Sequence, residues 1–78
     1  MANNREASMK KFRESISASV KPEKLDKVVE CCGDFYDESL FADDLSDTYD
    51  DVSSAIKGVD PDADTDVITN AFFKSVKG

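Results

Sequence analysis

Four aspartates alternate along the chain, at Asp60, Asp62, Asp64 and Asp66, and their spacing is the pattern in this sequence that comes nearest to a metal site. Carboxylate oxygens are ligands that Ca²⁺ prefers, and calcium loops take ligands from alternate residues. The first three aspartates therefore raise calcium binding as a hypothesis. The competing interpretation is a turn in which Asp62 or Asp64 caps the helix that follows.

Residues 60–72 resemble the opening of an EF-hand calcium loop, with Asp60, Asp62 and Asp64 as its first three ligands. The resemblance fails at two positions. Thr65 stands where such a loop needs glycine for its sharp turn, and Ala71 stands where a glutamate should bind the ion through both oxygens. We therefore predict no dedicated metal site and keep a degenerate calcium-binding module as a minor alternative.

The two cysteines, Cys31 and Cys32, are adjacent, and the chain contains no histidine. Adjacent Cα atoms lie about 3.8 Å apart, whereas disulfides span about 4.4 to 6.8 Å, so we expect two free thiols and a reducing compartment. Nucleophilic catalysis needs a base beside a serine, threonine or cysteine, and no acid or lysine is singled out by its spacing. The sequence predicts a protein that is not an enzyme and carries no cofactor.

Charge is distributed unevenly in this chain, whose net charge is −7. Residues 1–27 contain seven bases and four acids, whereas residues 34–66 contain twelve acids and a single base, Lys57. Nucleic acids and anionic membranes are disfavoured as direct ligands because binding to them depends on clustered lysine and arginine. The polar N-terminus is not followed by an apolar run, so we expect a cytoplasmic protein.

Apolar residues recur at helical spacing in four segments, and no segment alternates with the period of a strand. The inner stripes of the first three segments are Met9, Phe12, Ile16 and Val20; Leu25, Val28, Val29, Cys32, Phe35 and Tyr36; and Leu45, Tyr49, Val52 and Ile56. We predict a compact all-α single domain over residues 1–78, with about four short helices in a bundle or orthogonal array. Asn3 or Asn4 caps the first helix, which ends by about Val20, and Pro22 begins the second.

The second helix carries the clearest apolar stripe, which Gly33 interrupts. We favour a helix that continues through Gly33 to Tyr36, the alternative being a helix that ends at Gly33 with Phe35 and Tyr36 in the turn. Residues 37–43 are expected to connect the second helix to the third.

The third helix should end at Gly58 in a left-handed conformation. The fourth should begin after Asp62 or Asp64 and end near Lys77, whose charge suits the helix C-terminus. The apolar residues of the expected fourth helix form an inner stripe of Val67, Ile68, Ala71, Phe72 and Val76.

Helical spacing places Asp43, Asp47, Asp50 and Asp51 along one side of the third helix, with Asp44 beside them. One interpretation is a solvated face that maintains solubility. The other is a binding face that steers a basic partner. The chain is similar in composition to small acidic proteins that imitate DNA.

Three aromatic residues, Tyr36, Phe41 and Phe73, are expected to form an exposed apolar contact patch. Together with the aspartates they suggest a small protein-protein interaction module, an inhibitor or modulator that binds a basic surface of a nucleic-acid-binding or other partner protein. The alternative is a structural or assembly subunit that self-associates, or docks into a larger complex, through apolar helix surface.

Overall fold

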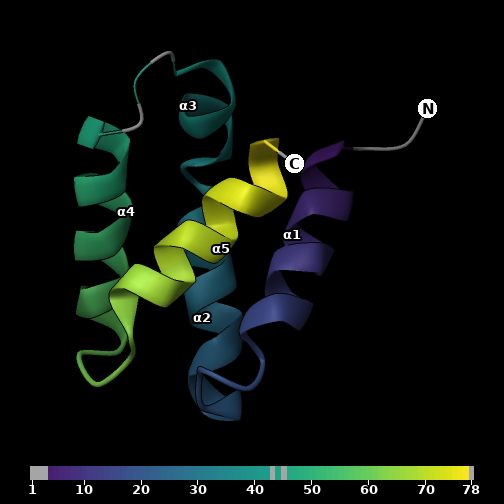
Figure 1. Cartoon of the computed structure of the whole chain (residues 1–78). Helices are drawn as coiled ribbons and strands as arrows, with labels where there is room; N and C mark the ends of the chain where they lie inside the picture. Colours follow the sequence, from purple (N-terminus) through teal and green to yellow (C-terminus); the bar gives the residue numbers. More distant parts are fainter. Residues whose placement is uncertain (1–3, 43, 45, 78) are drawn as a thin grey trace.

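The computed structural model describes residues 4–42, 44 and 46–77. Three residues named in the predictions lie outside the described residues: Asn3, a predicted helix cap; Asp43, one of the aspartates predicted along one side of the third helix; and Leu45. Within the described part the chain forms five helices and no strand (Figure 1). The helices are α1 (Asn4–Ile16), α2 (Pro22–Gly33), α3 (Tyr36–Phe41), α4 (Ser46–Val59) and α5 (Thr65–Lys77). The predicted all-α class is confirmed.

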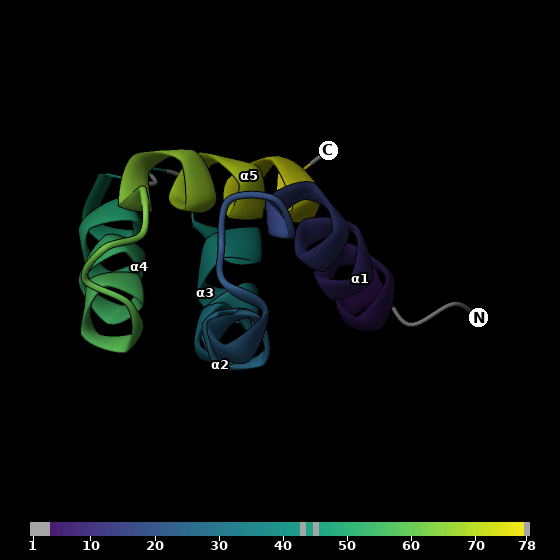
Figure 2. The same ribbon diagram turned by 90° about the horizontal axis from the view of Figure 1, so that it is seen from below.

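The helices form two layers. α1, α2 and α4 lie side by side with α2 in the middle, and α5 crosses them on one face (Figures 1 and 2). α5 packs against α1, α3 and α4, and α2 packs against α1 and α4. α1 and α4 therefore occupy opposite edges of the molecule. The radius of gyration is 11.4 Å, as expected for a compact chain of this length.

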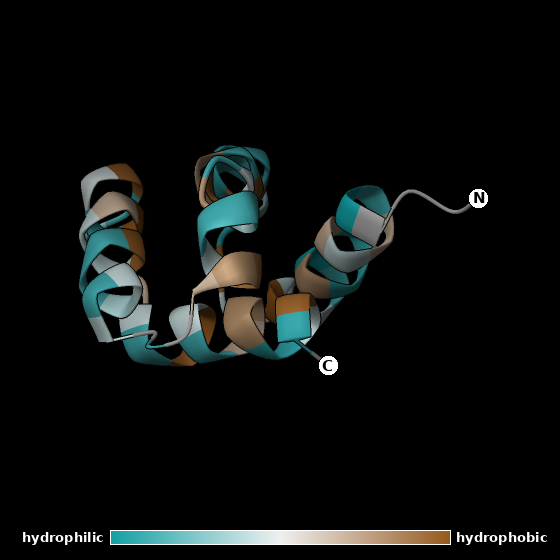
Figure 3. Cartoon of the chain, turned by 90° about the horizontal axis from the view of Figure 1, so that it is seen from above, coloured by the Kyte–Doolittle hydropathy of each residue, from teal (hydrophilic) through white to brown (hydrophobic). Residues whose placement is uncertain are grey.

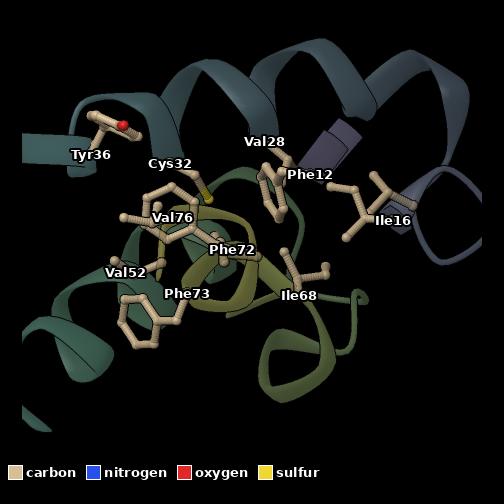
Figure 4. Packing of buried hydrophobic residues seen from close by; sticks show 12 residues of the cluster. Phe12, Ile16, Val28, Cys32, Tyr36, Val52, Ile68, Phe72, Phe73 and Val76 are labelled. Atoms are coloured by element: carbon tan, nitrogen blue, oxygen red, sulfur yellow. The ribbon is translucent and has the colours of Figure 1, made fainter. Parts of the chain in front are cut away.

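The core lies between α5 and the layer of three helices (Figure 4). Phe12 and Phe72 are fully buried, and their rings meet edge-on with centroids 5.4 Å apart. The other apolar residues with no exposed surface are Ile16, Val28, Cys32, Val52, Ile56 and Ile68. Each of these residues stands on an apolar stripe predicted from helical spacing.

The connection between α1 and α2 is a short turn. α1 ends at Ile16, whose carbonyl accepts the N–H groups of Ser19 and Val20 at 2.9 and 3.1 Å. Val20 is buried although it lies outside the helix. Pro22 begins α2, as predicted. Proline suits the first turn because the N–H group that it lacks would have no partner within the helix there.

The favoured continuation of α2 to Tyr36 is wrong. α2 ends at Gly33, residues 34 and 35 form a turn, and Tyr36 begins α3. No described glycine has a positive φ, so Gly33 does not end the helix as a left-handed cap. Its carbonyl instead accepts a hydrogen bond from Arg5 Nη2 at 3.2 Å, and a Cβ at Gly33 would lie 3.1 Å from that nitrogen. Glycine at this position thus leaves room for the guanidinium of Arg5 against the end of α2.

The prediction of a connection over residues 37–43 is wrong, because these residues include most of α3. Lys77 Nζ at the end of α5 donates hydrogen bonds to the carbonyls of Leu40, at 2.8 Å, and Ala42, at 3.4 Å. These carbonyls would otherwise be left unpaired at the C-terminus of a short helix. Lys77, which is 37 residues from Leu40 in the sequence, thus supports the end of α3.

The boundary between α4 and α5 differs from the prediction in part. α4 runs through Gly58 to Val59, so the left-handed end predicted at Gly58 is wrong. Asp64 caps α5 as predicted, since its Oδ1 accepts the N–H of Val67 at 3.3 Å. Two assignments on α5 are reversed: Val67 is 49% exposed, whereas Phe73 is buried. α5 packs against helices on both sides, so its buried arc is wider than a single stripe and includes Phe73.

Candidate partner-binding surface

The outer side of α4 carries three exposed carboxylates, from Asp47, Asp50 and Asp51, and Asp44 precedes them on the same exposed side of the chain. We call these four residues the acidic face. The orientation of α4 follows from its inner stripe, because Val52 and Ile56 are fully buried. Figure 3 shows the apolar residues of α4 on the side toward α2, which leaves the polar residues facing outward.

Two side-chain hydrogen bonds attach α4 to α5. Ser53 Oγ lies 2.9 Å from Thr69 Oγ1, and Tyr49 Oη donates to Asp66 Oδ1 at 2.7 Å. The ring of Tyr49 also packs against Phe73, with centroids 6.0 Å apart. These contacts fix the rotation of α4, and so they fix the direction in which the acidic face points.

Asp44 is ordered by the start of α4. Its Oδ1 accepts the backbone N–H of Ser46 at 2.9 Å. The hydrogen bonds from Ser46 lower the pKa of Asp44, because they favour the charged carboxylate. Asp44 is therefore fully ionised at neutral pH and extends the acidic face beyond the first residue of the helix.

None of the four carboxylates of the acidic face forms an ion pair with a described residue. An ion pair elsewhere in the described part of the chain joins Arg13 to Asp26, on α1 and α2. Carboxylates three or four residues apart on a helix repel each other by a few tenths of a kcal/mol. The acidic face thus has a small unfavourable energy that a cationic partner would relieve.

The predicted aromatic patch is not formed. Tyr36 is 5% exposed and Phe73 is 9% exposed, whereas Phe41 is 78% exposed. Tyr36 belongs to the core at the start of α3, and Phe73 lies beside Val52 on the α4 side of α5 (Figure 4). Of the three aromatic residues proposed for partner binding, Phe41 alone is available at the surface.

Two carboxylates of the segment that resembles a calcium loop, those of Asp60 and Asp64, accept hydrogen bonds from nearby backbone N–H groups. Asp60 is 4% exposed, and its Oδ1 accepts the N–H of Asp62 at 3.2 Å. Asp64 caps α5. The described residues contain no group of three histidine, cysteine, aspartate or glutamate side chains that could hold a metal ion. The turn-and-cap interpretation accounts for this segment.

Cys31 and Cys32 are both free, as predicted, with Cys31 partly buried and Cys32 fully buried. Burial raises the pKa of both thiols, and the charge of Asp34 raises that of Cys31 further. Because the thiolate is the nucleophile and the metal ligand, the raised pKa values lower the fraction of reactive thiolate at neutral pH.

The contact between Tyr49 and Asp66 was not foreseen. The sequence assigned Tyr49 to an inner stripe and Asp66 to a turn, and the two residues are seventeen positions apart. Only the packing of α4 on α5 brings them together.

No family model, curated protein or solved structure matches this chain. No described helix is long and apolar enough to cross a membrane.

Proposed function

We propose that this protein is a small acidic interaction module that binds a basic surface of a partner protein through the acidic face. The observation that carries the proposal is the set of exposed, unpaired carboxylates at Asp44, Asp47, Asp50 and Asp51. A partner that binds nucleic acid has a surface suited to such an array. The protein would then act as an inhibitor or modulator that competes with the nucleic acid.

The geometry of a helix supports this proposal. A rise of about 1.5 Å per residue places Asp47 and Asp51 about 6 Å apart along the axis of α4. One basic surface can contact both carboxylates at that spacing. The attachment of α4 to α5 through Ser53 and Tyr49 means that these charges are already oriented before binding, which lowers the entropic cost of association.

The second candidate function is a structural or assembly subunit that associates through apolar surface. Phe41, which is 78% exposed at the end of α3, is the observation that favours it. The burial of Tyr36 and Phe73 reduces the apolar surface available for such a contact. Light scattering over a concentration series separates the two candidates, because apolar self-association gives an oligomer that resists salt and is lost in Phe41→Ala.

The proposal is tested by capturing partners from a lysate of the source cells on the immobilised protein. One variant replaces Asp44, Asp47, Asp50 and Asp51 with asparagine. A matched control removes the same number of charges elsewhere, through Glu14→Gln, Glu30→Gln, Asp34→Asn and Asp62→Asn, all of them at exposed positions.

We expect the wild type and the control variant to retain the same basic protein, and the acidic-face variant to lose it. Raising the salt concentration should release the partner from the wild type. Capture that is equal for all three proteins, or that is insensitive to salt, would overturn the proposal.

A further inference from the structure

An open hollow lies beside the acidic face, where the first half of α4 meets α5. Ser46, Tyr49, Asp50 and Phe73 line it. The hollow combines aromatic carbon with the carboxylate of Asp50. The rings of Tyr49 and Phe73 are tilted at 52° to each other, with centroids 6.0 Å apart.

The aromatic wall of the hollow is fixed in place. Tyr49 Oη donates to Asp66 Oδ1 at 2.7 Å, so the ring is held at its hydroxyl end as well as at its backbone. Phe73 is 9% exposed and supports the ring from α5. A side chain that enters the hollow would therefore meet a surface that does not need to rearrange.

Carboxylates lie at and around the hollow, because Asp50 lines it and Asp66 accepts the hydrogen bond of Tyr49. The pKa of Tyr49 is raised, first by its hydrogen bond to Asp66 and also by the charges of Asp66, Asp64 and Asp50. Three carboxylates thus act on this one hydroxyl. Among the residues that the structure describes, no lysine or arginine lines the hollow, so a cation from outside would meet no competing positive charge from them.

We infer that this hollow accepts an arginine side chain of the basic partner, with the guanidinium stacked on Tyr49 and paired with Asp50. The inference rests on the proposed function and adds to it the chemical group that is recognised. A guanidinium is planar, is weakly hydrated, stacks on aromatic faces and forms directed hydrogen bonds to carboxylates. A lysine ammonium is a compact, strongly hydrated charge that gains less from an aromatic wall.

The test uses three small probes and two-dimensional NMR of the whole chain. The probes are the N-acetyl amides of arginine, of lysine, and of citrulline, which has nearly the shape of arginine without its charge. We expect saturable shifts at Ser46, Tyr49, Asp50 and Phe73 with the arginine probe, weaker binding of the lysine probe, and no response to the citrulline probe.

Three variants locate the site. Asp50→Asn should weaken the arginine probe about three- to tenfold by removing the paired charge, whereas the control Asp62→Asn should not change it. Tyr49→Leu should abolish the preference for arginine over lysine. Tyr49→Phe keeps the ring and should keep the preference, and well-resolved spectra of both Tyr49 variants would show that their folds are intact.

The outcomes separate this inference from the proposed function. Equal binding of the arginine and lysine probes, or arginine preference that survives in Tyr49→Leu, overturns the inference even when the acidic face captures its partner. A second outcome is that arginine binds in the hollow while the acidic-face variant captures the partner as well as the wild type does. This outcome upholds the inference about the ligand and overturns the proposed function. Absence of shifts with every probe also overturns the inference.

Discussion

α1 and α4 lie at opposite edges of the molecule and are attached to α5 by different kinds of contact. α1 is held by apolar packing, since Phe12 is fully buried and meets Phe72 of α5 edge-on. α4 also buries an apolar stripe, but two side-chain hydrogen bonds, from Ser53 and Tyr49, join it to α5. The polar contacts of α1 are made with α2 instead, from Arg5 to the Gly33 carbonyl and from Arg13 to Asp26. The two edge helices are therefore oriented by polar contacts with different neighbours, and α5 orients the α4 surface.

The outer surfaces of the two helices differ as well. α1 exposes Lys10, Lys11 and Arg13 together with Glu14, a mixed surface. On α4 the exposed charged residues that precede Lys57, in the last turn, are all aspartates. Packing of either helix requires its inner residues only, and the repulsion within the acidic face opposes folding. The fold gives Asp44 a local role at the start of α4, and Asp47 lies in the first turn, where the helix dipole favours an acid. It does not explain Asp50 and Asp51, which leaves solubility or binding to explain them.

The largest effect is expected from Phe12→Ala, which removes the buried ring that packs α1 against α5. Removing a buried phenylalanine side chain costs about 3 to 5 kcal/mol, which is similar to the whole stability that a core of this size supplies. We expect a largely unfolded protein by circular dichroism and urea denaturation. Phe41→Ala, at a 78% exposed position, should change stability by less than about 0.5 kcal/mol. Similar losses in both variants would contradict the assignment of the core.

The hydrogen-bonded side of the comparison is tested by Ser53→Ala. Thr69 is fully buried, so the variant leaves its hydroxyl without the partner it has at 2.9 Å, at a cost of about 1 to 3 kcal/mol. Ser54→Ala, on the exposed side of α4, is the matched control. Thr69→Val added to Ser53→Ala should recover most of the loss. If Ser53→Ala lowers the free energy of unfolding no more than Ser54→Ala does, the hydrogen bond between Ser53 and Thr69 does not stabilise the fold.

The features that the sequence predicted are those that local patterns determine. The buried stripes follow from spacings of three and four residues, Pro22 begins α2 because proline suits the first helical turn, and Asp64 caps α5 through a bond three residues along the chain. The acidic face was predicted for the same reason, because helical periodicity alone places its aspartates on one side. Asp43 lies outside the described residues.

The features that the sequence did not predict depend on contacts between distant residues. The end of α2 at Gly33 is coupled to Arg5, and α3 is supported by Lys77. Phe73 is buried because α5 packs against two edges of the molecule, which a single stripe does not indicate. The wall of the hollow requires Tyr49 and Asp66 to meet across two helices. Such pairs have no signature in one sequence.

Ionisation of Tyr49 provides a smaller and more local test of the α4 side. A Tyr36→Phe variant leaves Tyr49 as the single tyrosine, so absorbance follows its titration. The bond to Asp66 raises the pKa of Tyr49 above its ordinary value, so we expect a midpoint above about 10 that falls in Asp66→Asn. Because the pKa of Tyr49 is raised in the folded state, its hydrogen bond to Asp66 stabilises the protein fully below the pKa of tyrosine in the unfolded chain. This stabilisation is lost as the pH rises through the pKa of Tyr49 in the folded state. A midpoint that Asp66→Asn does not change would contradict the contact.

The smallest effect is expected from Asp51→Asn on the outer side of α4. Asp51 follows Asp47 by four residues, so the variant removes a repulsive pair and should stabilise the protein by about 0.2 to 0.5 kcal/mol. Urea denaturation at low salt measures the gain, which should shrink as salt is added. A destabilised variant would show that Asp51 has a structural role and would remove the contrast between the inner and outer sides of α4.

The central claim, that the acidic face binds a basic surface, is tested most directly by calorimetric titration with a lysine decapeptide. Three proteins are compared: the wild type, the acidic-face variant and the control variant with four other charges removed. We predict that binding at about 0.05 M salt is retained by the control, is lost in the acidic-face variant, and disappears for all three at about 0.5 M salt. Equal weakening in the two variants would contradict the claim, because it would show that net charge rather than the acidic face binds the peptide.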